Sequence, residues 1–186
     1  MAKRYYSQSG DRIEEIDPVI VSRYRGFTRA NHWVTAASLI VLLLSGMALF
    51  SPYLYFLTGL FGGGQTTRWL HPIVGIVLFF SFLILFLQLW RLNLPKPEDV
   101  TWVENIGEVL KGDEEKLPEL GKYNAGQKFI FWAMAGLIIV LIGTGVGIWQ
   151  QYFPDLTSIP VRRWATLIHS LAAVAIILVF ILHVYA

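Results

Sequence analysis

The sequence predicts an all-α integral membrane protein, built as a bundle of four transmembrane helices. Of its 186 residues, 55% are hydrophobic and 15% are charged, which is unusual for a water-soluble domain of this length. The apolar residues gather in four stretches, each long enough to cross a bilayer, because about 20 helical residues span roughly 30 Å of hydrocarbon. All four histidines of the chain fall within these stretches.

The helices are predicted, in chain order, at residues 33–51, 69–90, 129–151 and 163–186. Pro52 ends the first helix, and Pro72 stands where a proline is tolerated, in the first turn of the second. Three consecutive glycines, Gly62–Gly64, predict a flexible turn between these two helices. We therefore expect one membrane domain at residues 30–186, preceded by an N-terminal segment at residues 1–29.

Positive charges predict which helix ends face the cytoplasm, because short cytoplasmic loops are rich in Lys and Arg. The N-terminal segment and the loop at residues 91–128 carry most of these charges, and the other two connections carry few. Both termini and the 91–128 loop are therefore predicted to be cytoplasmic. The cytoplasmic set is Lys3, Arg4, Arg12, Arg23, Arg25, Arg29, Arg91, Lys96, Lys111, Lys116, Lys122 and Lys128, and the opposite set is Arg68, Arg162 and Arg163.

The chain contains no cysteine, which limits the cofactors that it can hold. Disulfides, zinc–thiolate sites, iron–sulfur clusters ligated by this chain and covalently attached c-type haem are all excluded. The net charge of +2 gives no indication of nucleic-acid binding. Any redox centre in this protein must therefore be bound noncovalently.

The histidines are expected to form two pairs. His183 follows His169 by 14 residues, which places the two about 21 Å apart along one helix and only about 40° apart around it. His32 opens the first helix from the side of His183, and His71 opens the second from the side of His169. One intramembrane histidine is more often a structural residue, but four costly ionisable groups in hydrocarbon suggest a common function.

Two imidazoles from different helices provide the axial ligands of a six-coordinate electron-transfer haem. The sequence therefore predicts two haems b, one bound by His71 and His169 near the outer side and one by His32 and His183 near the inner side. Glycines on the first and third helices either leave room for a haem or serve ordinary helix packing. These are Gly46, Gly143, Gly145 and Gly147.

Arginines near both ends of the bundle are candidates to bind haem propionates through charge-assisted hydrogen bonds. Arg25 and Arg29 lie on the predicted inner side, and Arg68, Arg162 and Arg163 lie on the outer side. The alternative is that these charges only set the topology.

The segment before the third helix has two possible functions. Asn124 and Gln127 have the spacing of a capping box, which would do no more than begin a helix. Side-chain amides and free backbone N–H groups at a helix start are also suitable donors to a quinone carbonyl. The residues alone leave both roles open.

Several motifs resemble the cytochrome b (gamma) subunit of membrane-bound respiratory formate dehydrogenase. The resemblance covers nearly the whole chain from Arg23 onward. It implies that His71 and His169 bind the outer haem and that His32 and His183 bind the inner one. It also implies a menaquinone site formed by Asn124, Gly126, Gln127 and His183. The motifs are Arg29-Ala30-Asn31-His32-Trp33, Leu70-His71-Pro72, Tyr123-Asn124-Ala125-Gly126-Gln127-Lys128, Leu167-Ile168-His169-Ser170 and Leu182-His183-Val184-Tyr185-Ala186.

The same resemblance implies that this chain does not oxidise formate. A periplasmic subunit with a molybdenum or tungsten pterin would do so, and an iron–sulfur subunit would pass the electrons on. The chain would anchor the complex in the bacterial inner membrane and carry the electrons through the outer and then the inner haem to menaquinone or a related quinone. A higher oligomer of this heterotrimer is compatible with the resemblance.

The family pattern differs from this sequence at both ends. Family members usually continue beyond the fourth helix with a basic tail, so we expect native sequence to be missing after Ala186. Residues 1–22 make the N-terminus longer than in the family, and no role is inferred for them.

Other classes of protein are compatible with the same residues. A cytochrome b subunit of a membrane hydrogenase, or of another periplasmic oxidoreductase, shares the haem arrangement. A proton transporter with a histidine relay and a structural anchor without cofactor share only the helices. Reduced-minus-oxidised spectra distinguish these classes, since only the cytochromes contain b-type haem.

Overall fold

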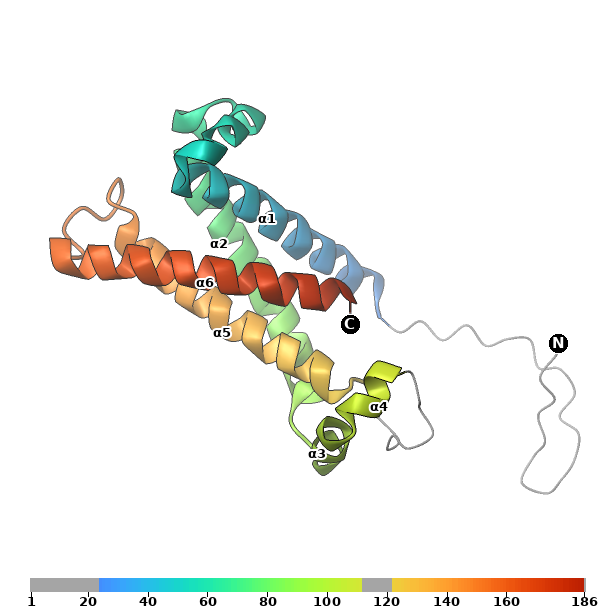
Figure 1. Cartoon of the computed structure of the whole chain (residues 1–186). Coiled ribbons are helices and arrows are strands. Elements are labelled where there is room, and N and C mark those ends of the chain that lie inside the picture. The colour runs from blue at the N-terminus through green and yellow to red at the C-terminus, as the bar shows by residue number, and fades with distance from the viewer. Residues whose placement is uncertain (1–23, 112–121, 186) are drawn as a thin grey trace, which may run out of the picture.

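The computed structural model describes residues 24–111 and 122–185, and these ranges contain only helices and their connections. Four long helices dominate, and each is long and apolar enough to cross a membrane. They are α1 (Gly26–Phe50), α2 (Gly64–Leu89), α5 (Ala125–Ile148) and α6 (Ile159–Tyr185), and the shorter elements are η1 (Pro52–Phe61), η2 (Trp90–Asn93), α3 (Pro97–Glu104) and α4 (Ile106–Lys111) (Figure 1). The all-α prediction and the four predicted spans are confirmed.

All four long helices begin earlier than the sequence predicts. For example, α1 begins at Gly26 rather than at residue 33, and α5 begins at Ala125 rather than at residue 129. The prediction followed the apolar residues that cross the hydrocarbon, whereas the hydrogen-bonded backbone continues through polar residues such as Arg29. The loop expected at residues 91–128 likewise includes helical turns, those of η2, α3 and α4.

Pro72 is the second correction. It lies inside α2, about two turns after the helix begins at Gly64, and not in the first turn as predicted. Because proline has no N–H group, one i→i−4 hydrogen bond of α2 cannot form there. The helix starts early because Gly62 and Gly63, with φ of 82° and 100°, make the predicted turn immediately before Gly64.

The four long helices form two antiparallel pairs that meet at the middle of the bundle. The pairs α1 with α2 and α5 with α6 each run side by side, and the two pairs cross (Figure 1). One buried side chain from each helix forms the core at the crossing: Leu39, Leu78, Ile138 and Ile176. Ile176 lies seven residues from His169 and seven from His183, so an apolar layer separates the two ends of the bundle.

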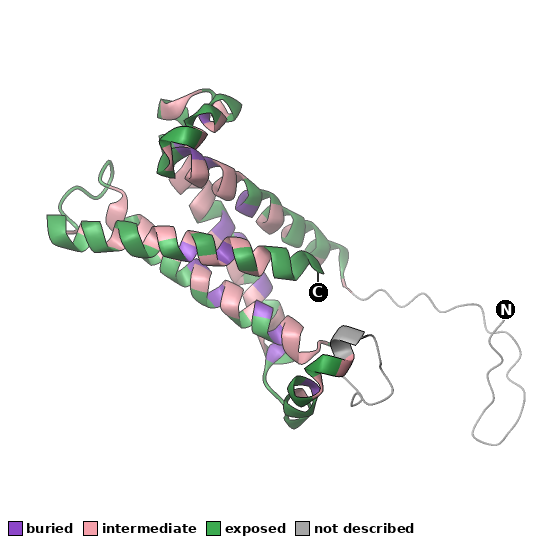
Figure 2. Ribbon diagram, in the orientation of Figure 1, coloured by how far each residue is buried: buried purple, intermediate pink, exposed green. Residues whose placement is uncertain are grey.

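The outer faces of the helices are apolar and exposed. Buried positions concentrate where the helix pairs cross, and exposed positions cover the outer surfaces (Figure 2). Large side chains such as Phe80, Leu171 and Val174 are more than half exposed. Exposure of this much apolar surface to water is unfavourable, so these faces are suited to contact with lipid.

Candidate functional site

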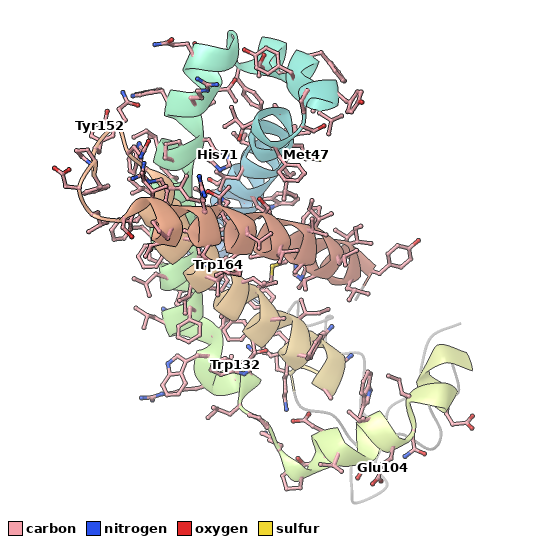
Figure 3. All side chains as sticks on the ribbon, turned by 60° about the vertical axis from the view of Figure 1, so that its left-hand side comes forward. Met47, His71, Glu104, Trp132, Tyr152 and Trp164 are labelled. Carbon is pink, nitrogen blue, oxygen red and sulfur yellow. The ribbon has the colours of Figure 1, made fainter. Side chains whose placement is uncertain are left out.

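The structure brings the four histidines together as two pairs. His71 on α2 and His169 on α6 have ring centroids 6.3 Å apart, and His32 on α1 and His183 on α6 have ring centroids 6.0 Å apart. Each pair therefore joins α6 to one helix of the other helix pair. The two pairs lie toward opposite ends of α6, because His169 and His183 are 14 residues apart on it. Figure 3 shows His71 far from Glu104 of α3.

The spacing within each pair suits two ligands on opposite sides of one metal ion. A metal lies about 2 Å from a coordinating imidazole nitrogen and the ring centre roughly 1 Å further back, so two such rings have centres about 6 Å apart. Across residues 24–111 and 122–185, no group of three or more His, Asp or Glu side chains could hold a metal ion. The remaining ligands would have to belong to the cofactor, as the four nitrogens of a porphyrin do.

The His71–His169 pair is held by hydroxyl groups of neighbouring helices. The Nδ1 atom of His71 lies 2.8 Å from Oγ of Ser45 on α1, and Nδ1 of His169 lies 2.9 Å from Oγ1 of Thr144 on α5. Ser45 is completely buried, and the two imidazoles are partly buried. With Nδ1 occupied in both rings, Nε2 is the nitrogen available to a metal.

Two of the predicted glycines face these imidazoles. A Cβ atom at Gly46 would lie 3.3 Å from Cε1 of His71, and a Cβ atom at Gly145 would lie 3.5 Å from Cε1 of His169. The other two behave differently: a Cβ at Gly143 would meet nothing within 4 Å, and one at Gly147 would meet Thr157 and Ala165. Gly46 and Gly145 therefore lie beside histidine rings, whereas Gly143 and Gly147 do not.

The His32–His183 pair has more open surroundings. Both residues are exposed, and neither ring accepts or donates a hydrogen bond among the described residues. The backbone next to His32 is nevertheless fixed to α2, because Asn31 Nδ2 donates to the carbonyl of Ser81 at 2.8 Å and the Thr35 and Ser81 hydroxyls are 2.5 Å apart. The helix position is thus held while the imidazole remains accessible.

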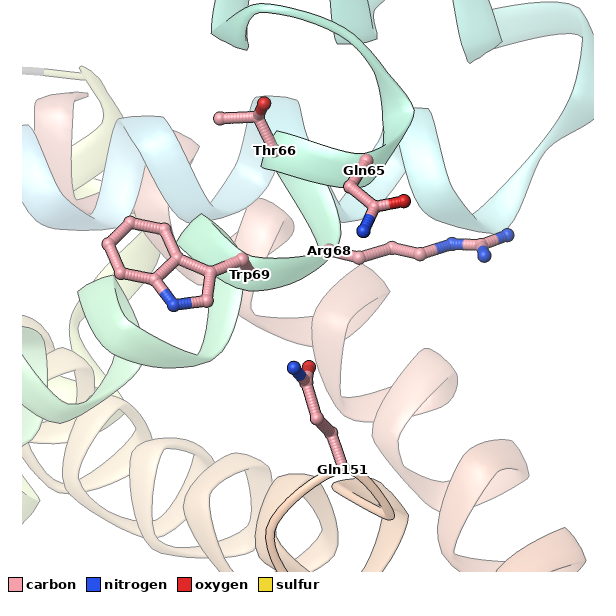
Figure 4. Close-up of a pocket in the computed structure, with 5 residues that line it drawn as sticks. All are labelled: Gln65, Thr66, Arg68, Trp69 and Gln151. Atoms are coloured by element: carbon pink, nitrogen blue, oxygen red, sulfur yellow. The ribbon is translucent and has the colours of Figure 1, made fainter.

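A pocket of about 520 Å³ opens at the His71–His169 end, between the start of α2 and the connection from α5 to α6 (Figure 4). Arg68, one turn before His71, is among the residues that line it. In the part of the chain that the structure describes, the Nε atom of Arg162 and the Nε1 atom of Trp149 are buried without a hydrogen-bond partner. Both donors are covered by other protein atoms, and neither residue is among those that line this pocket.

The other predicted arginines lie on the surface. Arg163 lines a shallow pocket along α6 with Pro160, Trp164 and Leu167. Arg25 and Arg29 are exposed at the start of α1, close in sequence to His32.

The start of α5 contains the predicted capping box. Asn124 Oδ1 accepts from the Gln127 N–H at 2.8 Å, and the Asn124 N–H donates to Gln127 Oε1 at 3.3 Å. Close beside it, a Cβ at Gly126 would lie 3.1 Å from the Trp102 ring of α3. The capping prediction is confirmed, and α3 packs against the segment for which a quinone site is predicted.

An ion pair that sequence reasoning missed joins these two elements. Lys128 Nζ of α5 lies 2.7 Å and 2.8 Å from the two carboxylate oxygens of Asp99 on α3, and Lys128 is buried. Burial raises the pKa of Asp99, but hydrogen bonds from Lys128 and from the Lys96 N–H, with the charges of both lysines, hold this pKa below its usual value. The carboxylate therefore stays ionised and fixes α3 to the start of α5.

Comparison with known proteins gives the class of this fold and site. Residues 23–186 match the family model described as prokaryotic cytochrome b561. Four apolar helices with histidines paired between them thus define a membrane cytochrome b.

Relatives identify the protein further. The formate dehydrogenase cytochrome b556(fdo) subunit of Escherichia coli K12 is 41% identical over 166 residues, covering 89% of this chain and 78% of that protein. The nitrate-inducible cytochrome b556(Fdn) subunit of the same strain is 40% identical, covering 89% and 76%. The formate dehydrogenase cytochrome b556 subunit of Haemophilus influenzae is 37% identical over 174 residues, covering 94% and 73%. The chain belongs to the prokaryotic cytochrome b561 family and, within it, to the cytochrome b556 subunits of formate dehydrogenase.

This result confirms the resemblance found in the motifs. The relatives are all formate dehydrogenase subunits, which favours that assignment over the alternative of a hydrogenase cytochrome b. As a member of this family, the chain has haem b as its cofactor and other formate dehydrogenase subunits as its partners.

Proposed function

We propose that this chain is the di-haem electron-transfer subunit of a respiratory formate dehydrogenase, with one haem b at each histidine pair. The observation that carries this proposal is the ring spacing of 6.3 Å and 6.0 Å in the two pairs. Bound in this way, haem b supplies reversible one-electron chemistry with no coordination position open to oxygen or substrate. Haem b is also the type that a chain without cysteine can bind.

The residues around each pair fit the parts of such a cofactor. At the His71–His169 end, Gly46 and Gly145 leave space beside the imidazoles. Arg68, which lines the pocket at this end, would donate to the propionates, and Arg162 and Arg163 of α6 are further candidates for this role. At the His32–His183 end, Arg25 and Arg29 would have this role.

Electrons would enter at the His71–His169 end and leave at the His32–His183 end. The distribution of Lys and Arg supports this direction, with the first end at the outer side and the second at the cytoplasmic side of a bacterial inner membrane. The entry end would face the iron–sulfur subunit, which receives its electrons from the molybdenum or tungsten pterin subunit that oxidises formate. In this division of labour, this chain anchors the complex and reduces quinone.

The quinone would bind where α5 begins, beside His183. Asn124 and Gln127 accept the hydrogen bonds of the capping box through their side-chain oxygens. The NH₂ group of Asn124 takes no part in the cap and would be a donor to the quinone. The Trp102 ring lies on the side of Gly126 where a Cβ would be, so Gly126 would contribute to the site through its backbone. We assign Asn124, Gly126, Gln127 and His183 to this site, with menaquinone or a related quinone as the acceptor.

Haem content is the direct test of the proposed function. The complete complex, purified from membranes, should show b-type haem at two per copy of this chain, measured from reduced-minus-oxidised spectra against protein mass. A value of zero would overturn the proposal and favour a histidine relay or a structural anchor. A value of one would overturn the assignment of a haem to each pair.

A further inference from the structure

The two helix pairs carry the same short arrangement at the His71–His169 end. In the first pair, Ser45 and Gly46 of α1 face His71 of α2, and in the second pair, Thr144 and Gly145 of α5 face His169 of α6. In both cases a hydroxyl residue followed by glycine presents its hydroxyl to Nδ1 and its bare Cα to the edge of the same ring. The repetition on separate helices indicates one common requirement.

The hydrogen bonds identify which imidazole nitrogen carries the proton. Ser45 Oγ also lies 2.7 Å from the carbonyl oxygen of Val41, and Thr144 Oγ1 lies 2.6 Å from that of Val140. A hydroxyl has one proton, and a carbonyl can only accept, so each hydroxyl donates to its carbonyl and accepts from the imidazole. Nδ1 of His71 and of His169 therefore carries hydrogen, and the lone pair is on Nε2.

We propose that Ser45 and Thr144 are positioning residues that fix His71 and His169 with Nε2 toward the haem iron and lower the reduction potential of that haem. The inference rests on the proposed function, because it requires a haem at this pair. A hydrogen bond donated by the Nδ1 hydrogen makes the imidazole a more basic ligand. A more basic ligand stabilises the ferric state over the ferrous state, which lowers the potential.

The other pair supplies an internal reference. No hydroxyl or carbonyl accepts from the rings of His32 and His183 among the described residues. The proposed effect is therefore confined to one of the two haems, and a change at Ser45 or Thr144 should leave the other haem unaffected.

The test uses the complete complex in membranes, with the two potentials measured by spectroscopic redox titration. Ser45→Ala and Thr144→Val remove the acceptor with little change in volume. Each should raise the potential of the His71–His169 haem, with about a tenfold change in the ferric-to-ferrous ratio at fixed potential, which is about 59 mV for one electron. The same variants should shift the low-temperature EPR signal of that ferric haem, because the imidazole is then free to rotate.

Matched variants separate the hydrogen bond from packing. Ser45→Thr and Thr144→Ser keep the hydroxyl and should keep the original potential. Ser170→Ala and Thr166→Val remove hydroxyls that bond only to the helix backbone, at 2.9 Å and 3.0 Å, and should also leave it unchanged. If Ser45→Ala loses the haem altogether while Ser45→Thr retains it, the positioning role is likewise supported.

Two results would overturn the inference. One is a complex with two haems whose potentials and EPR signals do not move in Ser45→Ala and Thr144→Val. The other is an equal shift in Thr144→Val and Thr144→Ser, because only Ser keeps the hydroxyl and the hydroxyl would then not be the cause of the shift. Both differ from failure of the proposed function, in which the unmodified complex itself has no haem at this pair.

Discussion

The two histidine pairs share one geometry but have different surroundings. The His71–His169 pair is partly buried, and its imidazoles are tied to hydroxyls of α1 and α5. The His32–His183 pair is exposed, and no hydrogen bond within the described residues holds its rings. Ligand spacing alone therefore does not define a site, because the neighbours decide how rigidly the ligands are held and what can reach them.

The difference in surroundings fits the two different tasks proposed for the pairs. A site that only receives and passes electrons is best kept rigid, since fixed ligands need little rearrangement when the charge changes. A site beside a reducible small molecule must remain open to it. The sequence shows the same contrast, since the Ser-Gly and Thr-Gly dipeptides occur at one end and the amide-rich start of α5 occurs at the other.

Alanine substitution of a ligand should have the largest effect on this comparison. His71→Ala should remove one haem per chain and leave the other, and His183→Ala should remove only the second, because each pair holds its iron independently. Haem-to-protein ratios of about one in both variants would support the pairing. Equal loss of both haems from each correctly inserted variant would contradict it.

A side chain at Gly46 should disturb only the rigid pair. Gly46→Val would place carbon within contact of the His71 ring, 3.3 Å from Cε1 at the Cβ alone, and push the imidazole from its position. We expect a large loss of the His71–His169 haem and a normal second haem, measured by redox titration of the α-band. Gly143→Ala is the control, because its Cβ would meet nothing within 4 Å, and an equal effect there would refute this explanation.

Asn124→Asp should affect only the open end. Aspartate is as good an N-cap as asparagine, so α5 should still form, but the NH₂ group that we propose as a donor to the quinone is lost. Quinone reduction should slow by about tenfold, as expected for loss of one hydrogen bond in the site, with both haem spectra normal. Normal quinone reduction in Asn124→Asp would remove this residue from the quinone site.

Asn124→Ala separates the two roles of this residue. It removes both cap and donor and should in addition destabilise the protein by about 1 kcal/mol. Thermal unfolding of the detergent-solubilised complex measures this difference, which Asn124→Asp should not show.

The smallest effect is expected at the ion pair of Asp99 and Lys128. The folded state holds the pKa of Asp99 below its usual value. The ion pair therefore stabilises the protein at any pH above the pKa of an ordinary carboxyl group, and this stabilisation is lost as the pH falls through the pKa of Asp99 in the folded state. Asp99→Asn should cost about 1 kcal/mol at neutral pH and less in acid. Thermal unfolding at several pH values measures this, and a loss that grows in acid would contradict the assignment.

The main features of the fold follow from hydrophobic length, helical periodicity and chain direction. These three predicted the four spans, and they predicted which histidine approaches which. His71 is level with His169 because α2 and α6 both begin at the same end of the bundle. The capping box was also visible, since Asn124 and Gln127 are three residues apart. Spacing along the sequence predicts a contact reliably when both residues lie in one helix or in two helices whose directions are known.

Contacts between particular faces of different helices could not be predicted in this way. Ser45 and Thr144 look like ordinary small residues of membrane helices, and their function depends on which face of α1 and α5 turns toward a histidine. Asp99 and Lys128 are 29 residues apart, and their contact depends on how α3 folds back. A hydroxyl followed by glycine about 25 residues before an intramembrane histidine is the signal that could have found the first two.

The apolar layer of Leu39, Leu78, Ile138 and Ile176 is a barrier to protons between the two ends of the protein. None of these four side chains can carry a proton, so under the proposed function an electron would cross this layer without one. Such a crossing would separate charge across the membrane and store about 2.3 kcal/mol for each charge moved through 100 mV. A polar or ionisable residue in place of Ile176 would give protons a path through this layer.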